Sequence, residues 1–203
     1  MVSGITPKGL LCWDLDGVLL KAPTEQHDWR WLLSPTERQL YRATVEAPEW
    51  QDCLCGRMDV GLLLEQQAIK LGANIEAIAH ILHAWHDETL TPDEPVHHLL
   101  RTMRKAGWHT VIASNQDIAR AAWVKMKLGL DDAVHDWFFS CQLGIAKPDQ
   151  AFYEAITQKL SLPNLPCVMI DDVAANLSAP TSMGWYTHQF TGAEHLQCFL
   201  EDL

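Results

Sequence analysis

Two acidic side chains stand one residue apart where a buried β-strand is expected to end. Asp14 and Asp16 follow the apolar residues 9–13, and Gly17 lets the backbone turn sharply. A short, continuous apolar run is typical of a parallel strand buried on both faces. Because ligands of open α/β sheets bind beyond the carboxyl ends of the strands, this position favours a chemical role for both acids. A plain Asp-Xaa-Asp-Gly turn also fits these residues, so the rest of the chain must decide.

Neighbouring carboxylates can bind a metal ion and attack an electrophile. They repel each other, so they usually share a cation or a proton. Mg²⁺ prefers oxygen ligands and keeps several waters, which suits such a pair. A carboxylate also becomes an effective nucleophile when the charge of its target is neutralised and the two are held in line.

Further polar clusters lie at predicted strand ends and helix starts. Apolar residues 110–113 and 167–170 predict two more buried strands. The clusters are Ser114-Asn115, Lys147 in the loop 144–149, and Asp171-Asp172 with Asn176 a helical turn later. Each alone fits a plain structural role, such as a helix cap or a surface lysine. Together they indicate a phosphate site, in which a lysine and a hydroxyl orient phosphoryl oxygens, carboxylates hold a metal and one carboxylate attacks phosphorus.

In this order, the four clusters resemble the four motifs of the haloacid dehalogenase superfamily. The resemblance extends over about residues 8–20 and 92–192, and within the superfamily it is closest to the small sugar-phosphate phosphatases, which have a helical cap. It implies that Asp14 is the nucleophile and forms an aspartyl-phosphate. It also implies that Asp16 is the general acid and base, and that Lys147 neutralises both the phosphate and Asp14.

The resemblance assigns the remaining polar residues to phosphate and Mg²⁺ binding. Ser114 and the backbone amide of Asn115 would hold phosphate oxygens. The metal ligands would be Asp14, the backbone carbonyl of Asp16, and a third carboxylate. Asp172 is the first choice for that third ligand, with Asp171 binding directly or through water. Asn176 would orient these ligands from behind.

The presence of Asp16 favours phosphoryl transfer over dehalogenation. Dehalogenating members of the superfamily lack an acid at this position and need no metal. The resemblance therefore implies a Mg²⁺-dependent phosphomonoesterase acting on a small phosphorylated metabolite such as a sugar phosphate. A phosphomutase, a 2-haloacid dehalogenase and a catalytically weak binding protein remain as alternatives.

Helices that alternate with apolar strands predict an α/β fold with a doubly wound, Rossmann-like parallel sheet. We expect this catalytic core to comprise residues 1–19 and 92–203, and residues 20–91 to form an inserted helical cap. Right-handed crossovers would bring the strand ends near positions 14, 114 and 171 to one crevice. We also expect Pro148 to take the first position of a helix.

The predicted cap shows helical spacing and clear helix boundaries. Ser34-Pro35 predicts a helix start and Gly72 a helix end. Arg57, beside Gly56, is a candidate to bind a second anionic or hydroxyl group of the substrate. Two apolar faces are predicted, formed by Val60, Leu63, Leu64, Gln67, Ala68 and Leu71, and by Ile75, Ile78, Ala79 and Leu82. Five histidines are expected on solvated helix faces rather than at a metal: His80, His83, His86, His97 and His98.

Composition narrows the class of protein. The 203 residues include 26 acidic and 15 basic side chains, a net charge of −11, which argues against nonspecific nucleic-acid binding. No apolar run reaches the ~18 residues of a membrane span, and Asp14 and Asp16 interrupt the first apolar stretch, which argues against a signal peptide. Six scattered cysteines fit reduced thiols. We therefore expect a cytoplasmic enzyme, monomeric or homodimeric.

Overall fold

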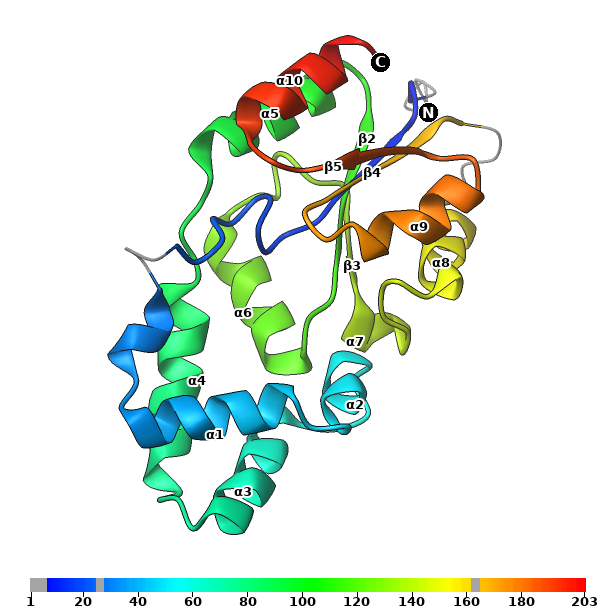
Figure 1. Cartoon of the computed structure of the whole chain (residues 1–203). Helices are drawn as coiled ribbons and strands as arrows, with labels where there is room; N and C mark the ends of the chain where they lie inside the picture. Colours follow the sequence, from blue (N-terminus) through cyan, green and yellow to red (C-terminus); the bar gives the residue numbers. More distant parts are fainter. Residues whose placement is uncertain (1–6, 25–27, 162–164) are drawn as a thin grey trace.

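The computed structural model describes residues 7–24, 28–161 and 165–203, and its centre is a five-stranded sheet. All pairings are parallel and the strand order is β3-β2-β1-β4-β5 (Figure 1). The strands are β1 (Leu10–Trp13), β2 (His109–Ser114), β3 (Asp136–Phe139), β4 (Cys167–Asp171) and β5 (Tyr186–Gln189). This arrangement confirms the predicted doubly wound α/β fold.

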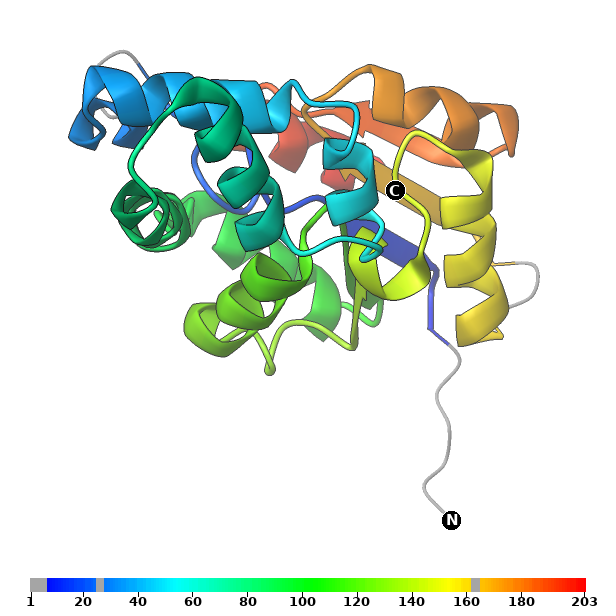
Figure 2. The same cartoon turned by 90° about the horizontal axis from the view of Figure 1, so that it is seen from below.

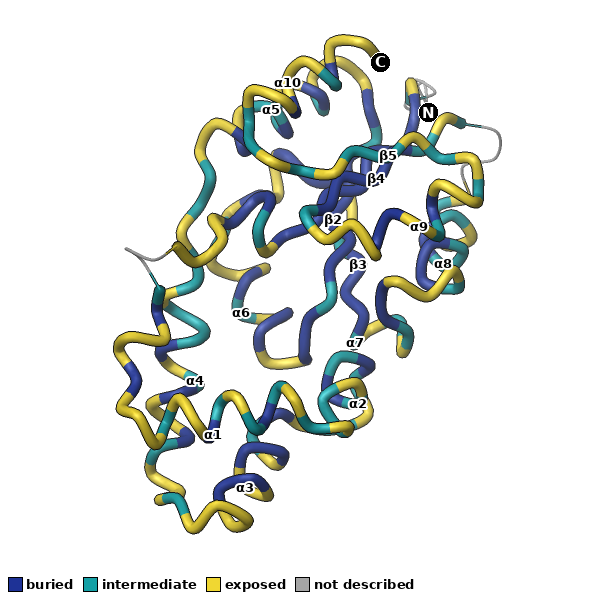
Figure 3. Tube along the Cα trace, in the orientation of Figure 1, coloured by how far each residue is buried: buried dark blue, intermediate teal, exposed yellow. Residues whose placement is uncertain are grey.

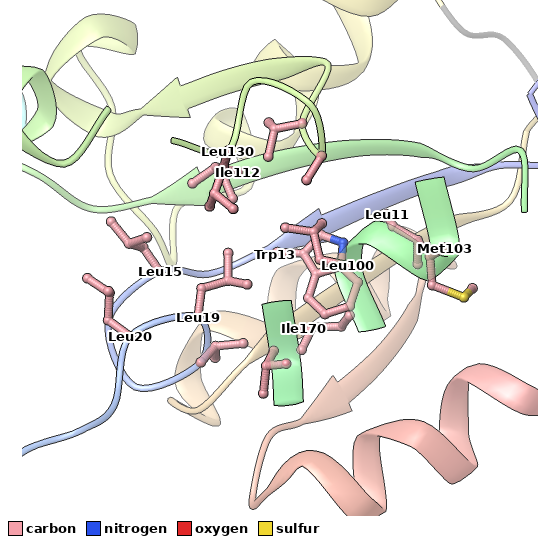
Figure 4. Close-up of a cluster of buried hydrophobic side chains, with 14 of the residues drawn as sticks. Leu11, Trp13, Leu15, Leu19, Leu20, Leu100, Met103, Ile112, Leu130 and Ile170 are labelled. Atoms are coloured by element: carbon pink, nitrogen blue, oxygen red, sulfur yellow. The ribbon is translucent and has the colours of Figure 1, made fainter. Parts of the chain in front are cut away.

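Helices cover both faces of the sheet, and alternate residues of β1 pack against different helices. Leu11 and Trp13 lie in a cluster with residues of α5 (Glu94–Lys105), α6 (Ile118–Leu128) and α10 (Ala193–Glu201). Figure 4 shows Trp13 beside Leu100 and Ile170 in this cluster. Leu10 and Cys12 face the opposite side, against α8 (Gln150–Leu160) and α9 (Ala175–Ser182). Because strand side chains alternate between faces, a strand covered on both sides must be apolar throughout.

The helix boundaries follow local capping signals. The carboxylates of Asp93 and Asp117 accept backbone hydrogen bonds at the starts of α5 and α6, and Gly129 ends α6 in a left-handed conformation. Asp149 caps α8 by accepting from the Ala151 N–H at 2.9 Å. Pro148 therefore precedes α8, and its predicted place as the first helical residue is wrong, because the Asp149 carboxylate sets the helix start.

In the described part of the chain between β1 and α5 there are five helical elements. They are η1 (Trp29–Leu32), α1 (Pro35–Val45), α2 (Trp50–Leu54), α3 (Val60–Leu71) and α4 (Glu76–Glu88). We call residues 28–88 the helical insertion. Figure 3 shows buried positions alternating with exposed ones along its helices, and its side chains form their own apolar clusters around Leu40 and Leu64 and around Cys53 and Leu63.

The sequence analysis predicted the boundaries of the helices in the insertion more accurately than it predicted which of their residues are buried. The Ser34 capping box and the left-handed Gly72 confirm the predicted start of α1 and end of α3. In α3, Leu71 is exposed although the other five predicted positions are buried. In α4, Ile75 and Ala79 are exposed, and the buried residues are Ile78, Ile81 and Ala84. The buried face of α4 thus differs from the predicted one, because Ile78, Ile81 and Ala84 are the residues that pack in one cluster with Leu40 of α1 and Leu64 of α3.

Two histidines predicted on solvated faces are partly or wholly removed from solvent, since His86 is half-buried and His97 is buried. His97 is 3% exposed, and its Nε2 lies 2.9 Å from the Leu19 carbonyl oxygen. The His86 ring lies between Trp85 and Trp123, with ring centroids 5.6 and 6.4 Å away. None of the described helices is long and apolar enough to cross a bilayer.

The helical insertion contacts the core at α6 and at α7 (Ser140–Leu143), as well as through its two connections. Viewed from below in Figure 2, α2 lies beside α7. The connections run side by side, since Lys21 N donates to Thr91 O at 2.9 Å and Asp93 N donates to Leu19 O at 2.9 Å.

Candidate active site

Charged groups from three separated segments meet at the carboxyl end of the sheet. Lys147 Nζ lies 2.9 Å from Asp14 Oδ1 and 2.6 Å from Asp171 Oδ2. All three residues are buried. Asp14 directly follows β1 and Asp171 ends β4, and these strands are paired in register, so the two carboxylates are brought together by the sheet itself.

Asp171 is fully engaged by donors of the protein. Besides Lys147, its oxygens accept from the Val173 backbone N–H at 2.9 Å and from Asn176 Nδ2 at 3.0 and 3.1 Å. Asn176 lies at the start of α9, and its own backbone carbonyl accepts from the Tyr153 hydroxyl. The predicted supporting position of Asn176 thus places its amide directly on Asp171.

Asp172 faces the backbone of the first motif. A Cβ atom at position 17 would lie 2.3 Å from Asp172 Oδ2, and Gly17 has a φ of +80°. Glycine is required here for two reasons: a residue with a side chain would be strained at this φ, and its Cβ would displace the Asp172 carboxylate. Asp172 is half-buried, and one oxygen each of Asp14, Asp171 and Asp172 lie within 4.8 Å of one another.

The end of β2 supplies a hydroxyl and an amide. The Ser114 hydroxyl is buried and accepts from Gln116 Nε2 at 3.1 Å. The Asn115 side chain fixes the loop that carries the lysine: its Nδ2 donates to the Lys147 carbonyl at 2.9 Å, and its Oδ1 accepts from the Lys147 N–H at 2.8 Å. Asn115 therefore positions the Lys147 backbone through its side chain, while its backbone amide was the predicted phosphate ligand.

Most of the predicted site residues line one cavity of about 320 Å³. Its lining consists of Asp14, Asp16, Gly17, Ala22, Pro23, Ser114, Asn115, Lys147, Asp172, Val173 and Asn176. Asp171 lies behind this lining. A phosphate-sized anion in the cavity would meet an ammonium, a hydroxyl and several carboxylates.

Burial and mutual repulsion make negative charge costly at this site. Burial raises the pKa of Asp14 to about 7, the Lys147 ammonium opposes this rise, and the Asp171 carboxylate adds to it. Burial followed by repulsion from Asp171 also raises the pKa of Asp172. Three carboxylates face one ammonium here, so the group carries unneutralised negative charge that a cation would offset.

Two residues that the sequence analysis missed hold Asp16. Arg120 Nη2 lies 2.5 Å from Asp16 Oδ1, and Gln116 Nε2 donates to Asp16 Oδ2 at 2.6 Å. Arg120 shares the buried face of α6 with Ala121 and Val124. A charged residue on an otherwise apolar helix face was the one signal in the sequence that could have revealed it.

Arg57 lies outside the cavity lining. Its Nε contacts Asp52 Oδ1 at 2.7 Å, and its Nη1 donates to the Gly144 carbonyl at 3.3 Å. In this arrangement Arg57 joins the helical insertion to the start of the loop that carries Lys147. Its predicted contact with substrate stays a prediction.

Comparison with known proteins agrees with this geometry. A family model described as haloacid dehalogenase-like hydrolase matches residues 9–184. No protein of curated function matches the chain in sequence.

Solved structures of similar fold include enzymes of this family. A Bacteroides thetaiotaomicron member, an aspartate-to-alanine mutant in complex with magnesium and inorganic phosphate, has a TM-score of 0.73 and 16% identity, covering 89% of this chain and 93% of its own. L-2-haloacid dehalogenase from Xanthobacter autotrophicus, with chloropropionic acid covalently bound, has a TM-score of 0.61 and 17% identity, covering 88% and 76%. At such identities the likeness concerns the fold, whereas the family model covers most of the sequence. The chain therefore belongs to the haloacid dehalogenase-like hydrolases.

Proposed function

We propose that this enzyme is a Mg²⁺-dependent phosphomonoesterase that acts on a small phosphorylated metabolite. The observation that carries the proposal is the juxtaposition, around one cavity, of the Asp14 carboxylate, the Lys147 ammonium, the Ser114 hydroxyl and a second acid, Asp16. A phosphoryl group needs its negative charge neutralised before a carboxylate can attack it, and this set supplies both parts.

In the first step Asp14 attacks phosphorus. Its carboxylate oxygen forms a bond to phosphorus while the bond to the leaving oxygen breaks, and Asp16 donates a proton to that oxygen. Lys147 and Ser114 hold the phosphoryl oxygens and keep the group in line with Asp14. The products are an alcohol and an aspartyl-phosphate on Asp14.

In the second step water releases the phosphate. Asp16 takes a proton from the water as its oxygen attacks the phosphorus of the aspartyl-phosphate, and the bond to Asp14 breaks. Inorganic phosphate leaves and Asp14 is regenerated. A single side chain serves both steps, because an acid that has given up its proton can act as a base.

The chemistry of the donor set fits Mg²⁺. Asp14 and Asp172 would hold the ion together with the backbone carbonyl of Asp16, because the oxygens of Asp171 are already engaged by Lys147, Asn176 and a backbone N–H. All of these donors are oxygens, which Mg²⁺ prefers. Bound Mg²⁺ supplies positive charge that offsets the carboxylates and the phosphoryl oxygens.

The size and surroundings of the cavity support a small substrate. Among the described residues of the segment 20–91, only Ala22 and Pro23 contribute to the lining, and both are small and uncharged. We propose that the helical insertion, as part of a cap spanning residues 20–91, covers the site and excludes water. Residues 1–19 and 92–203 would then form the catalytic core.

Phosphate release from a panel of sugar phosphates, nucleotides and phospho-acids tests the proposal. We expect release that requires Mg²⁺, stops with a chelator and is absent in Asp14→Asn. A parallel assay for the alternative dehalogenase activity measures chloride release from 2-chloropropionate without added metal. Chloride release together with no phosphate release from any monoester would overturn the phosphatase assignment in favour of a dehalogenase.

A further inference from the structure

Arg120 is a buried cation that connects the core to the helical insertion. Its side chain is 2% exposed, and a guanidinium that is removed from water needs partners for its charge and its N–H groups. Those partners come from both parts of the chain. Asp16 belongs to the core, while Trp85 and Thr89 lie at the end of α4 in the insertion and its connection.

The Arg120 contacts are close and directional. Nη2 lies 2.5 Å from Asp16 Oδ1, and Nη1 donates to Thr89 Oγ1 at 2.6 Å and to the Trp85 carbonyl at 3.4 Å. The guanidinium carbon also lies 5.9 Å from the centre of the Trp85 ring. One terminal nitrogen of the planar guanidinium thus binds the acid, and the other binds the end of the insertion and its connection.

Asp16 depends on these donors for its orientation. Its side chain is 49% exposed, so packing alone leaves it free to change rotamer. Arg120 holds Oδ1, and Gln116 holds Oδ2 at 2.6 Å while also donating to Ser114 Oγ. In the conformation fixed by these contacts, Asp16 lines the cavity.

We propose that Arg120 is a positioning residue that keeps Asp16 at the cavity and makes this placement depend on the helical insertion. The inference rests on the proposed phosphomonoesterase function and deepens it. Arg120 lies behind Asp16 and does not line the cavity, so its effect on turnover passes through the acid. When the insertion shifts, the Thr89 and Trp85 contacts shift with it, and the guanidinium that orients Asp16 moves.

The kinetic test compares Arg120→Met and Arg120→Lys with the wild type. We expect Arg120→Met to lower kcat by about 10- to 100-fold, part of the roughly 10²–10⁴-fold value of a general acid, with KM changed only a few-fold. The loss should be larger for an alkyl phosphate than for p-nitrophenyl phosphate, whose leaving group needs little protonation. Arg120→Lys should recover part of the activity, since it keeps the charge but not the planar fork.

Two further variants separate positioning from a general structural effect. In an Asp16→Asn background, Arg120→Met should cause no additional loss of kcat, because both changes disable the same group. Thr89→Val, which removes only the hydroxyl that Arg120 contacts, should give a smaller loss with the same leaving-group preference. Arg101→Met, which breaks an ion pair with Asp132 far along the surface, is the control and should leave kcat unchanged.

A crystal structure of Arg120→Met tests the proposal independently of enzyme activity. If that variant does not fold, Arg120→Lys takes its place. We expect Asp16 to leave the cavity lining or to occupy several rotamers. Equal losses for both leaving groups, additive losses with Asp16→Asn, or an unmoved Asp16 in the crystal would overturn the role of Arg120. Absence of phosphate release by the wild type would instead refute the phosphomonoesterase function, and the position of Asp16 would still decide the inference.

Discussion

At the scale of single residues, the neighbours Asp171 and Asp172 have different surroundings despite their identical chemistry. Asp171 is fully buried and accepts from Lys147, Asn176 and a backbone N–H. Asp172 is half-buried and packs against Gly17 at the cavity. The first acid therefore organises the charged centre, and the second is the better placed to bind a metal.

Replacing each of these acids by asparagine should separate the two roles. Asp171→Asn should destabilise the metal-free protein by about 1–3 kcal/mol, since buried donors lose a charged acceptor. Asp172→Asn should change the stability of the metal-free protein far less, because burial already makes the charge of Asp172 costly. The same change should weaken Mg²⁺ binding, because it removes a proposed carboxylate ligand. Thermal unfolding with a chelator and with Mg²⁺ measures both effects. Equal behaviour of the two variants would contradict the assignment.

Asp14→Asn should abolish turnover while stabilising the metal-free protein at neutral pH. Burial raises the pKa of Asp14 from 3.8 to about 7 in the folded state. Between these two pH values the folded state binds more protons than the unfolded state, so the free energy of unfolding falls as the pH rises from about 4 to about 7. Above about pH 7 the folded protein bears the full cost of the buried Asp14 charge. Removing the charge should raise the free energy of unfolding by about 1 kcal/mol or more at pH 8, and each kcal/mol corresponds to roughly 2–4 °C in Tm.

The same measurement at low pH supplies the control for this prediction. With chelator present, the Tm advantage of Asp14→Asn should shrink as the pH falls from about 7 toward about 4, and it should vanish below that, where the wild-type carboxyl is protonated in both states. A variant less stable than wild type at pH 8 would mean that the Lys147 contact outweighs the cost of burial.

At the scale of elements, the loop after α2 docks closely on α7. A Cβ atom at position 56 would lie 2.3 Å from the Cys141 carbonyl oxygen, and Gly56 has a φ of +68°. Arg57 adds its hydrogen bond to Gly144, three positions before Lys147 in the sequence. The helical insertion thus touches both the α7 backbone and the loop that carries Lys147.

Gly56→Ala should push the helical insertion away from α7. The added methyl overlaps backbone, which cannot rotate away, so we expect a lower Tm and faster proteolysis of the insertion than in wild type. Gly72→Ala is the matched control, because Gly72 also has a left-handed φ of +64° but no atom within 4 Å of the added carbon. If both variants lose the same stability, backbone strain and not docking explains the effect.

At the scale of the whole molecule, the substrate that we propose is an anion, whereas the protein itself is negatively charged. The chain carries a net charge of −11, so its overall field opposes phosphate binding. Lys147 and Arg120 are both buried beside the candidate site, and each contacts one of the two proposed catalytic acids, Asp14 and Asp16. For the proposed function, these side chains and the proposed Mg²⁺ would supply the local positive charge.

Mg²⁺ should stabilise the folded protein by mass action. At a concentration ten times its Kd, a ligand that binds only the folded state adds about 1.4 kcal/mol, which is roughly 3–6 °C in Tm for a chain of this size. NaCl of equal ionic strength is the control, and Asp172→Asn should lose most of the increase. An equal rise with NaCl would indicate screening of the surface charge and not a specific site.

Much of the catalytic end of the molecule could be predicted from local sequence. The apolar residues before Asp14, Ser114 and Asp171 form strands, and parallel strands that pair in register bring their ends together. Helix boundaries such as Ser34 and Gly72 were also predictable, because capping depends on residues within one turn of each other.

Only the tertiary structure decided which partner each charged group meets. Arg120 contacts Asp16 across 104 positions in the sequence, and no local rule connects an α6 side chain with the turn after β1. The same holds for the partial burial of His86 and for the contact of Arg57 with Gly144. Periodicity and capping are set by near neighbours in the sequence, whereas these contacts depend on how complete helices pack, so they appear only once the fold exists.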